Sequence, residues 1–149
     1  MGSESNIVNS SARNTAFPRF LSAMENSLSK KRQIDPITLA QFIGSEKFYR
    51  HSSVAEIIYS EGARYVAEVG GAYWLLDEIA FAQRFEPEVR KEQFQVWDLY
   101  VASSRSATLT CTDGDRKTVY KKKINWTDFP PPGIQLFVAN SCIHLPSEY

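Results

Sequence analysis

Three side chains of this sequence, Glu46, His51 and Asp77, could together perform acid–base chemistry. Histidine exchanges protons near neutral pH, and a carboxylate that is buried in an apolar segment can serve as an acid or a base. If the three meet in one cleft, they would form the site of a small hydrolase-type enzyme. The structural alternative is a surface pair between Glu46 and Arg50, four residues apart, with Asp77 bound to a backbone N–H or an arginine.

Basic side chains gather in one predicted hairpin, and they are Arg116, Lys117, Lys121, Lys122 and Lys123. Together with nearby aromatic residues they could bind single-stranded nucleic acid through phosphate contacts and stacking. Strand alternation places Lys121 and Lys123 on one face and Lys122 on the other, so they form no single patch. We therefore favour an edge hairpin whose lysines prevent aggregation, with nucleic-acid binding as the less favoured alternative.

A cluster of aromatic residues follows this hairpin and precedes a proline-rich loop. Large aromatic side chains at a surface are typical of protein-binding hot spots. The candidate partner-binding residues are Tyr120, Trp126, Asp128 and Phe129. The alternative is that Trp126 and Phe129 cap the core.

Other catalytic and cofactor motifs are absent from the sequence. It contains no G-x-S-x-G elbow, phosphate loop or H-E-x-x-H, and the turn at Asp113 and Asp115 lacks the pattern of a calcium loop. Cys111 and Cys142 have no C-x-x-C partner, so we expect two free thiols rather than a disulfide or, with His51 and His144, a zinc site. We expect no cofactor and no metal.

Composition indicates a folded protein with one core. The chain has 149 residues, of which 43% are hydrophobic, and 17 basic residues balance 17 acidic ones. This neutrality argues weakly against a dedicated nucleic-acid binder. No apolar run is long enough to span a membrane, and the N-terminus does not resemble a signal peptide. We therefore expect a cytoplasmic protein with a flexible tail at 1–16 and one domain at 17–149.

The first half of the chain contains helix and turn signals. The spacing of apolar residues over 17–31 predicts a helix, and Pro36 is expected to break the chain. Residues 38–42 are ambiguous between helix and strand. We interpret 57–67 as a hairpin that turns at Gly62, and the competing interpretation is a helix over 60–69.

The second half changes from a helical to a strand pattern. Gly70 and Gly71 end the preceding unit, a wide apolar helix is predicted at 72–84, and the charged run 86–92 is predicted to be an exposed connection. Strands are predicted from 94 onward, at 107–112, 118–124, 134–138 and 141–145. The predicted fold is α+β, with an antiparallel sheet of about five strands packed against the helix and an extra N-terminal helix.

Several short motifs resemble those of an uncharacterised family of small bacterial proteins. They include the stretch GAYWLLD at 71–77, the segment TDFP at 127–130 and the closing LPSEY at 145–149, and the resemblance covers about residues 42–149. The resemblance implies a bacterial source near plasmid or prophage genes and supplies no catalytic residue. Together with the aromatic cluster, it suggests a non-enzymatic protein-binding module, one version being a mobile-element-encoded, anti-CRISPR-like inhibitor of a host defence complex.

Overall fold

The computed structural model describes residues 33–44 and 46–149. The tail predicted at 1–16 and the helix predicted at 17–31 lie outside the described residues. Residues Gln33–Tyr149 form one unit, built from a sheet, two longer helices and several short ones. None of the helices in this part of the chain is long and apolar enough to cross a membrane.

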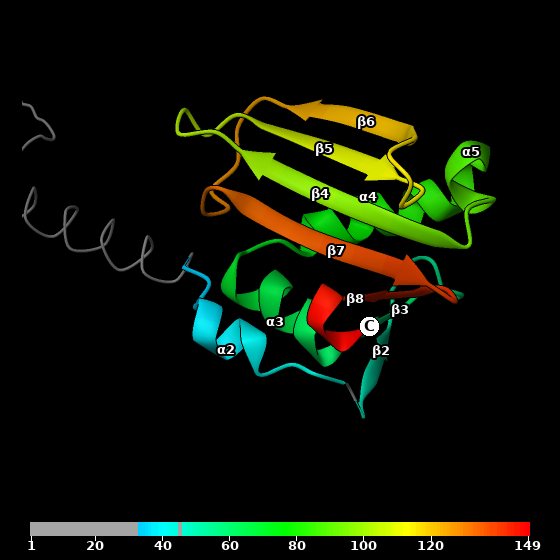
Figure 1. Cartoon of the computed structure of the whole chain (residues 1–149), viewed down its shortest axis with the longest axis horizontal. Coiled ribbons are helices and arrows are strands. Elements are labelled where there is room, and N and C mark those ends of the chain that lie inside the picture. Colours follow the sequence, from blue (N-terminus) through cyan, green and yellow to red (C-terminus); the bar gives the residue numbers. More distant parts are fainter. Residues whose placement is uncertain (1–32, 45) are drawn as a thin grey trace, which may run out of the picture. The chain divides into compact units, whose positions relative to one another are not determined.

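Seven strands form one sheet in the order β2-β3-β8-β7-β4-β5-β6 (Figure 1). Their bounds are β2 Phe48–Arg50, β3 Ile58–Ser60, β4 Phe94–Val101, β5 Ala107–Thr112, β6 Thr118–Ile124, β7 Gly133–Ala139 and β8 Cys142–His144. The pairs are antiparallel apart from β3 and β8, which run parallel with Ile58 opposite Cys142. The α+β class is confirmed, but the sheet is mixed and larger than predicted, because the three-residue strands β2 and β3 are too short to show an alternating pattern.

The helices are α2 Pro36–Ala40, α3 Glu61–Val69, α4 Tyr73–Phe85, α5 Pro87–Arg90 and the 3-10 helix η1 Pro146–Glu148. The apolar helix predicted at 72–84 is α4. The hairpin predicted at 57–67 is wrong, and the competing helix is correct. Ser60 is the N-cap of α3, and its hydroxyl accepts a hydrogen bond from the Ala63 N–H at 3.1 Å. Gly62 therefore lies in a helix and not at a turn.

Two short helices differ from expectation. Pro36 begins α2 instead of breaking the chain, because a proline fits the first turn of a helix and the Asp35 side chain caps it. The run 86–92, predicted to be an exposed connection, contains α5, and Val89 on this helix is fully buried. Sequence patterns miss such helices because four or five residues are too few to show a helical period.

One face of the sheet packs against α4, which lies behind β4, β5 and β7 in Figure 1. Alternation along β4 buries Gln95, Trp97, Leu99 and Val101 on this face. They meet a helix face whose fully buried members include Leu75, Leu76 and Ile79. The opposite face of β4 carries Asp98 and Tyr100, and no described helix crosses β4, β5 or β6 on that side (Figure 1).

The predicted break at Gly70 and Gly71 is explained by packing. Gly70 lies directly beneath the ring of Phe129, and a Cβ atom placed on Gly70 would lie 2.5 Å from that ring. Gly71 has a φ of 63°, a conformation that glycine adopts at no steric cost. The pair thus turns the chain between α3 and α4 and leaves room for Phe129 in the core.

Candidate functional site

His51 and Asp77, two of the three predicted acid–base residues, do meet. His51 follows β2 and is 4% exposed, and its Nε2 lies 2.7 Å from Asp77 Oδ1 on α4. The other ring nitrogen, Nδ1, accepts hydrogen bonds from the backbone N–H groups of Val54 at 3.0 Å and Ser53 at 3.2 Å. Because Nδ1 is an acceptor, Nε2 carries the hydrogen and donates it to Asp77.

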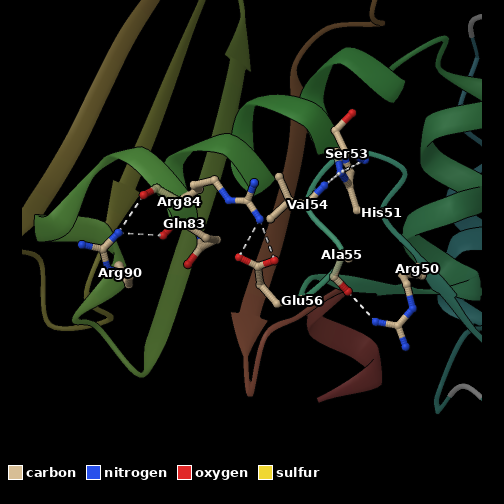
Figure 2. A network of polar contacts seen from close by, with 9 residues as sticks. All are labelled: Arg50, His51, Ser53, Val54, Ala55, Glu56, Gln83, Arg84 and Arg90. Carbon is tan, nitrogen blue, oxygen red and sulfur yellow. Dashed lines mark hydrogen bonds and ion pairs between the residues drawn. The ribbon is translucent and has the colours of Figure 1, made fainter.

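This arrangement uses both nitrogens of His51 (Figure 2 shows the contacts with Ser53 and Val54). Within the described part of the chain, Glu46 is exposed and makes no hydrogen bond or ion pair with either His51 or Asp77. The three predicted residues therefore do not share a point at which a substrate could react. The contacts that His51 and Asp77 make hold the turn after β2 against α4.

A second polar network, which the sequence did not indicate, lies at the C-terminal end of α4 (Figure 2). Arg84 contacts both carboxylate oxygens of Glu56, at 2.9 and 3.1 Å, and Arg90 donates to the Arg84 carbonyl oxygen at 2.7 Å. A cation at this position satisfies carbonyl groups that the helix leaves without intrahelical partners. The network thereby fixes α5 against α4.

Buried amide groups extend this network into the core. Gln95 is 2% exposed, and its Nε2 donates to the Val89 carbonyl oxygen at 2.9 Å while its Oε1 accepts from Trp97 Nε1 at 2.9 Å. Gln83 forms a side-chain pair with Gln95 at 2.7 Å. A hollow of about 420 Å³ lies beside this pair. Because the buried amide of Gln95 and the half-buried amide of Gln83 are satisfied within the chain, they serve the packing of α4, α5 and β4.

The segment between β6 and β7 holds Trp126 at the surface. The Trp126 side chain is 65% exposed, whereas Phe129 is fully buried. Backbone hydrogen bonds join Thr127 N–H to the Arg105 carbonyl oxygen at 2.9 Å and Val101 N–H to the Pro132 carbonyl oxygen at 2.9 Å. Arg105 Nη1 also lies 3.3 Å from the carbonyl oxygens of residues 128 and 129. The loop is thus anchored at both ends and through its middle.

The other predicted partner-binding residues do not share this exposure. Phe129 packs in the core, as the capping alternative described. Tyr120 is half-buried and packs on Trp97 with ring centroids 5.5 Å apart, and burial raises the pKa of its hydroxyl. Asp128 is half-buried. Of the four, Trp126 is the side chain that the fold leaves open to solvent.

The consecutive lysines of the basic hairpin alternate between the two faces of the sheet, as the strand pattern predicts. Lys122 lies on the helix side, where its Nζ contacts Glu78 Oε2 on α4 at 2.5 Å. Lys121 and Lys123 are opposite Thr110 and Thr108 of β5, on the other face. Arg116 and Lys117 lie in the turn before β6. The strand itself is the last of the sheet, so one of its edges has no neighbouring strand among the described residues.

The two cysteines are free thiols. Burial raises the pKa of Cys111 to about 12 and that of Cys142 to about 11. Since the thiolate is the reactive form, neither sulfur is activated as a nucleophile at neutral pH. The described residues contain no group of three or more His, Cys, Asp and Glu side chains that could hold a metal ion.

Comparison of the chain with known proteins identifies a family but no function. A family model described as a family of unknown function, DUF6876, matches residues 36–149. No curated protein matches the chain, and no solved structure does.

Proposed function

This chain belongs to DUF6876, a family of unknown function, and we propose from the geometry that it is a non-enzymatic protein-binding module. The observation that carries the proposal is Trp126, an indole 65% exposed on a loop that hydrogen bonds hold in place. Tryptophan is among the residue types most enriched at binding hot spots.

The anchoring of the loop supports this role energetically. Binding orders flexible side chains and loops, which reduces affinity, so a segment ordered beforehand binds more tightly. Phe129 fills the core directly below the loop, and Arg105 bonds two of its carbonyl groups. Tyr100, 62% exposed, lies near the same end of β4, next to the strand end that the loop contacts through Val101. Two exposed aromatic side chains at this end of the sheet offer a partner an apolar contact.

The two alternatives have less support. The predicted catalytic residues do not converge, because both nitrogens of His51 are bonded within the chain, and both thiols have raised pKa values. Nucleic-acid binding through β6 would need several free cations on one face, but Lys122 is paired with Glu78 on the other face. A protein partner therefore fits best, and the resemblance to proteins of mobile elements makes a host defence complex one candidate.

A comparative pull-down tests the proposal. Wild type, Trp126→Ala and the control Phe85→Ala, which removes another exposed aromatic side chain (67% exposed) from α4, would be used to capture proteins from native bacterial lysate for quantitative mass spectrometry. We expect one stoichiometric partner with wild type and the control, and its loss with Trp126→Ala. With the purified partner, Trp126→Ala should weaken the affinity by about 30-fold or more. Equal capture by the two variants would contradict the proposal.

A further inference from the structure

A second surface feature, separate from the Trp126 loop, lies at the C-terminal LPSEY motif. A hollow of about 350 Å³ is lined by Phe48, Ser60, Asn140, Cys142, His144 and Tyr149, among others. Ile143 of β8 is buried on the helix side, so Cys142 and His144 point to the opposite side of the sheet. The hollow therefore lies on the face of the sheet that α4 does not cover.

Aromatic rings border this hollow. Phe48 of β2 pairs with Ser60 of β3, and Tyr59 of β3 lies opposite Ile143 of β8, so Ser60 and His144 are the next residues along these two parallel strands. Phe48 and His144 are thus two strands apart, about 10 Å, and the Ser60 side chain lies between them with the Glu148 carboxylate 2.6 Å from its hydroxyl. The Phe48 ring is 51% exposed and offers a face on which a flat ring can stack.

The ring of His144 is held rigidly. It stacks on Tyr149 with centroids 5.7 Å apart and planes 9° apart, and the edge of Phe137 approaches it at 6.1 Å. Its Nδ1 lies 3.2 Å from the Cys142 carbonyl oxygen. A carbonyl oxygen only accepts, so Nδ1 carries the hydrogen, and in the neutral ring Nε2 is left with a free lone pair.

This Nε2 atom is the unusual feature of the site. His144 is 8% exposed, yet no described residue forms a hydrogen bond with its Nε2. Buried polar atoms in folded proteins almost always have a partner, so an unpartnered acceptor at a hollow indicates a missing donor. Asn140, which also lines the hollow, adds an amide that both donates and accepts.

These groups define the chemistry of a ligand. The exposed Phe48 ring favours a planar ligand, the His144 acceptor requires an N–H or O–H group at the ligand's edge, and the Asn140 amide suits an edge with both donors and acceptors. The Glu148 carboxylate, held by Ser60 Oγ at 2.6 Å and Leu145 N–H at 2.9 Å, lies in the wall and disfavours an anionic ring. We propose that the hollow binds a nucleobase, stacked on Phe48 and donating a hydrogen bond from its edge to His144 Nε2.

Calorimetric titration tests this site with two kinds of probe. The first kind is the four free nucleosides adenosine, guanosine, cytidine and uridine, and the second is single-stranded homo-oligonucleotides of the same bases. We expect at least one nucleoside or oligonucleotide to bind wild type with a Kd of about 1 mM or tighter. Tighter binding by the oligonucleotide identifies a base within a strand as the ligand, and equal binding identifies the free nucleoside. The absence of binding by every probe up to about 5 mM would overturn the proposal.

Three variants connect binding to the named groups. Asn140→Gly removes the amide and preserves the turn, because Asn140 has a φ of 53° that glycine tolerates. Phe48→Ala removes an exposed ring from an edge strand, and His144→Phe keeps a ring on Tyr149 but removes the acceptor. Each should weaken binding about tenfold, with thermal unfolding recorded to verify the fold. Unchanged affinity in both Phe48→Ala and His144→Phe would overturn the proposal.

Trp126→Ala separates this site from the proposed protein-binding function. Because Trp126 belongs to the loop between β6 and β7 and does not line the hollow, we expect its replacement to leave the nucleobase affinity unchanged. Loss of nucleobase binding in a correctly folded Trp126→Ala protein would contradict the assignment to His144 and Phe48.

Discussion

At the scale of single residues, the position of the Phe129 ring in the core requires a glycine at position 70. The Phe129 ring enters the core from the loop that presents Trp126, and it occupies the space that a side chain at position 70 would need. The position of an exposed candidate residue is thus determined by a buried contact with the turn between α3 and α4.

Gly70→Ala is therefore expected to lower the free energy of unfolding by about 1–3 kcal/mol, because an overpacked core shifts side chains or backbone. Chemical denaturation monitored by circular dichroism would measure the change. Gly44→Ala is the matched control, since nothing lies within 4 Å of a Cβ at Gly44. If both variants unfold like wild type, Phe129 does not fill the core as tightly as described.

The residue types in the sequence identified several of the side chains that form these contacts, but they did not reveal which groups surround each side chain. His51 and Asp77 were recognisable as a chemical pair, whereas the backbone groups of Ser53 and Val54 that occupy the second nitrogen depend on a turn after a three-residue strand. Phe129 follows Trp126 by three residues in an irregular segment, where no periodicity distinguishes a buried ring from an exposed one.

At the scale of elements, the start of α3 depends on the far end of the chain. Ser60 caps α3 through Ala63 N–H, and its hydroxyl donates to Glu148 at 2.6 Å, while Glu148 also accepts from Gly62 N–H at 3.2 Å. A carboxylate near the N-terminus of a helix is favourable because of the positive end of the helix dipole. Glu148 of the LPSEY motif thereby stabilises the start of α3, more than eighty residues earlier in the chain.

Ser60→Ala should lower the free energy of unfolding by about 1–2 kcal/mol, because it removes the helix cap and one of the donors to Glu148. Ser104→Ala is the control, since within the described part of the chain its hydroxyl pairs only with that of Ser106, at an exposed turn. Thermal and urea unfolding of the two variants give the comparison. Equal stability losses would show that the cap contributes nothing specific.

Elements with long periodic patterns were predictable, and those defined by distant contacts were not. The apolar period identified α4, and alternation identified the strands from β4 to β8. The region around Gly62 was misjudged because glycine there accommodates Leu145 and Glu148, 2.5 and 2.6 Å from where its Cβ would lie, and such a requirement is invisible locally. Ser60 as an N-cap was the available signal for a helix.

At the scale of the whole molecule, the sheet ends in a strand that carries three consecutive lysines. Unpaired backbone groups at a sheet edge attract other strands, and lysines at the edge oppose this association. Lys121 and Lys123 lie on the face that no described helix covers, whereas Lys122 is paired with Glu78. Lys121 and Lys123 form no ion pair with the residues that the structure describes, and they are therefore in the position to keep copies of the protein apart.

The double variant Lys121→Thr and Lys123→Thr is expected to form concentration-dependent oligomers without a lower melting temperature, because threonine favours strands and removes the repulsion. Light scattering coupled to size-exclusion chromatography, at several concentrations, would detect them. A variant with Lys47→Thr and Lys91→Thr removes the same charge elsewhere. If both double variants elute alike, the lysines of β6 do not protect the edge.

The parallel pairing of β3 with β8 has a consequence for synthesis on the ribosome. β8 is the last strand in the chain, yet it lies inside the sheet, between β3 and β7. Until residues 142–144 have left the ribosome, the segment formed by β2 and β3 has no partner in the sheet, although the meander from β4 to β7 can already pair. The two parts of the sheet can therefore join only after β8 has emerged and been inserted between them.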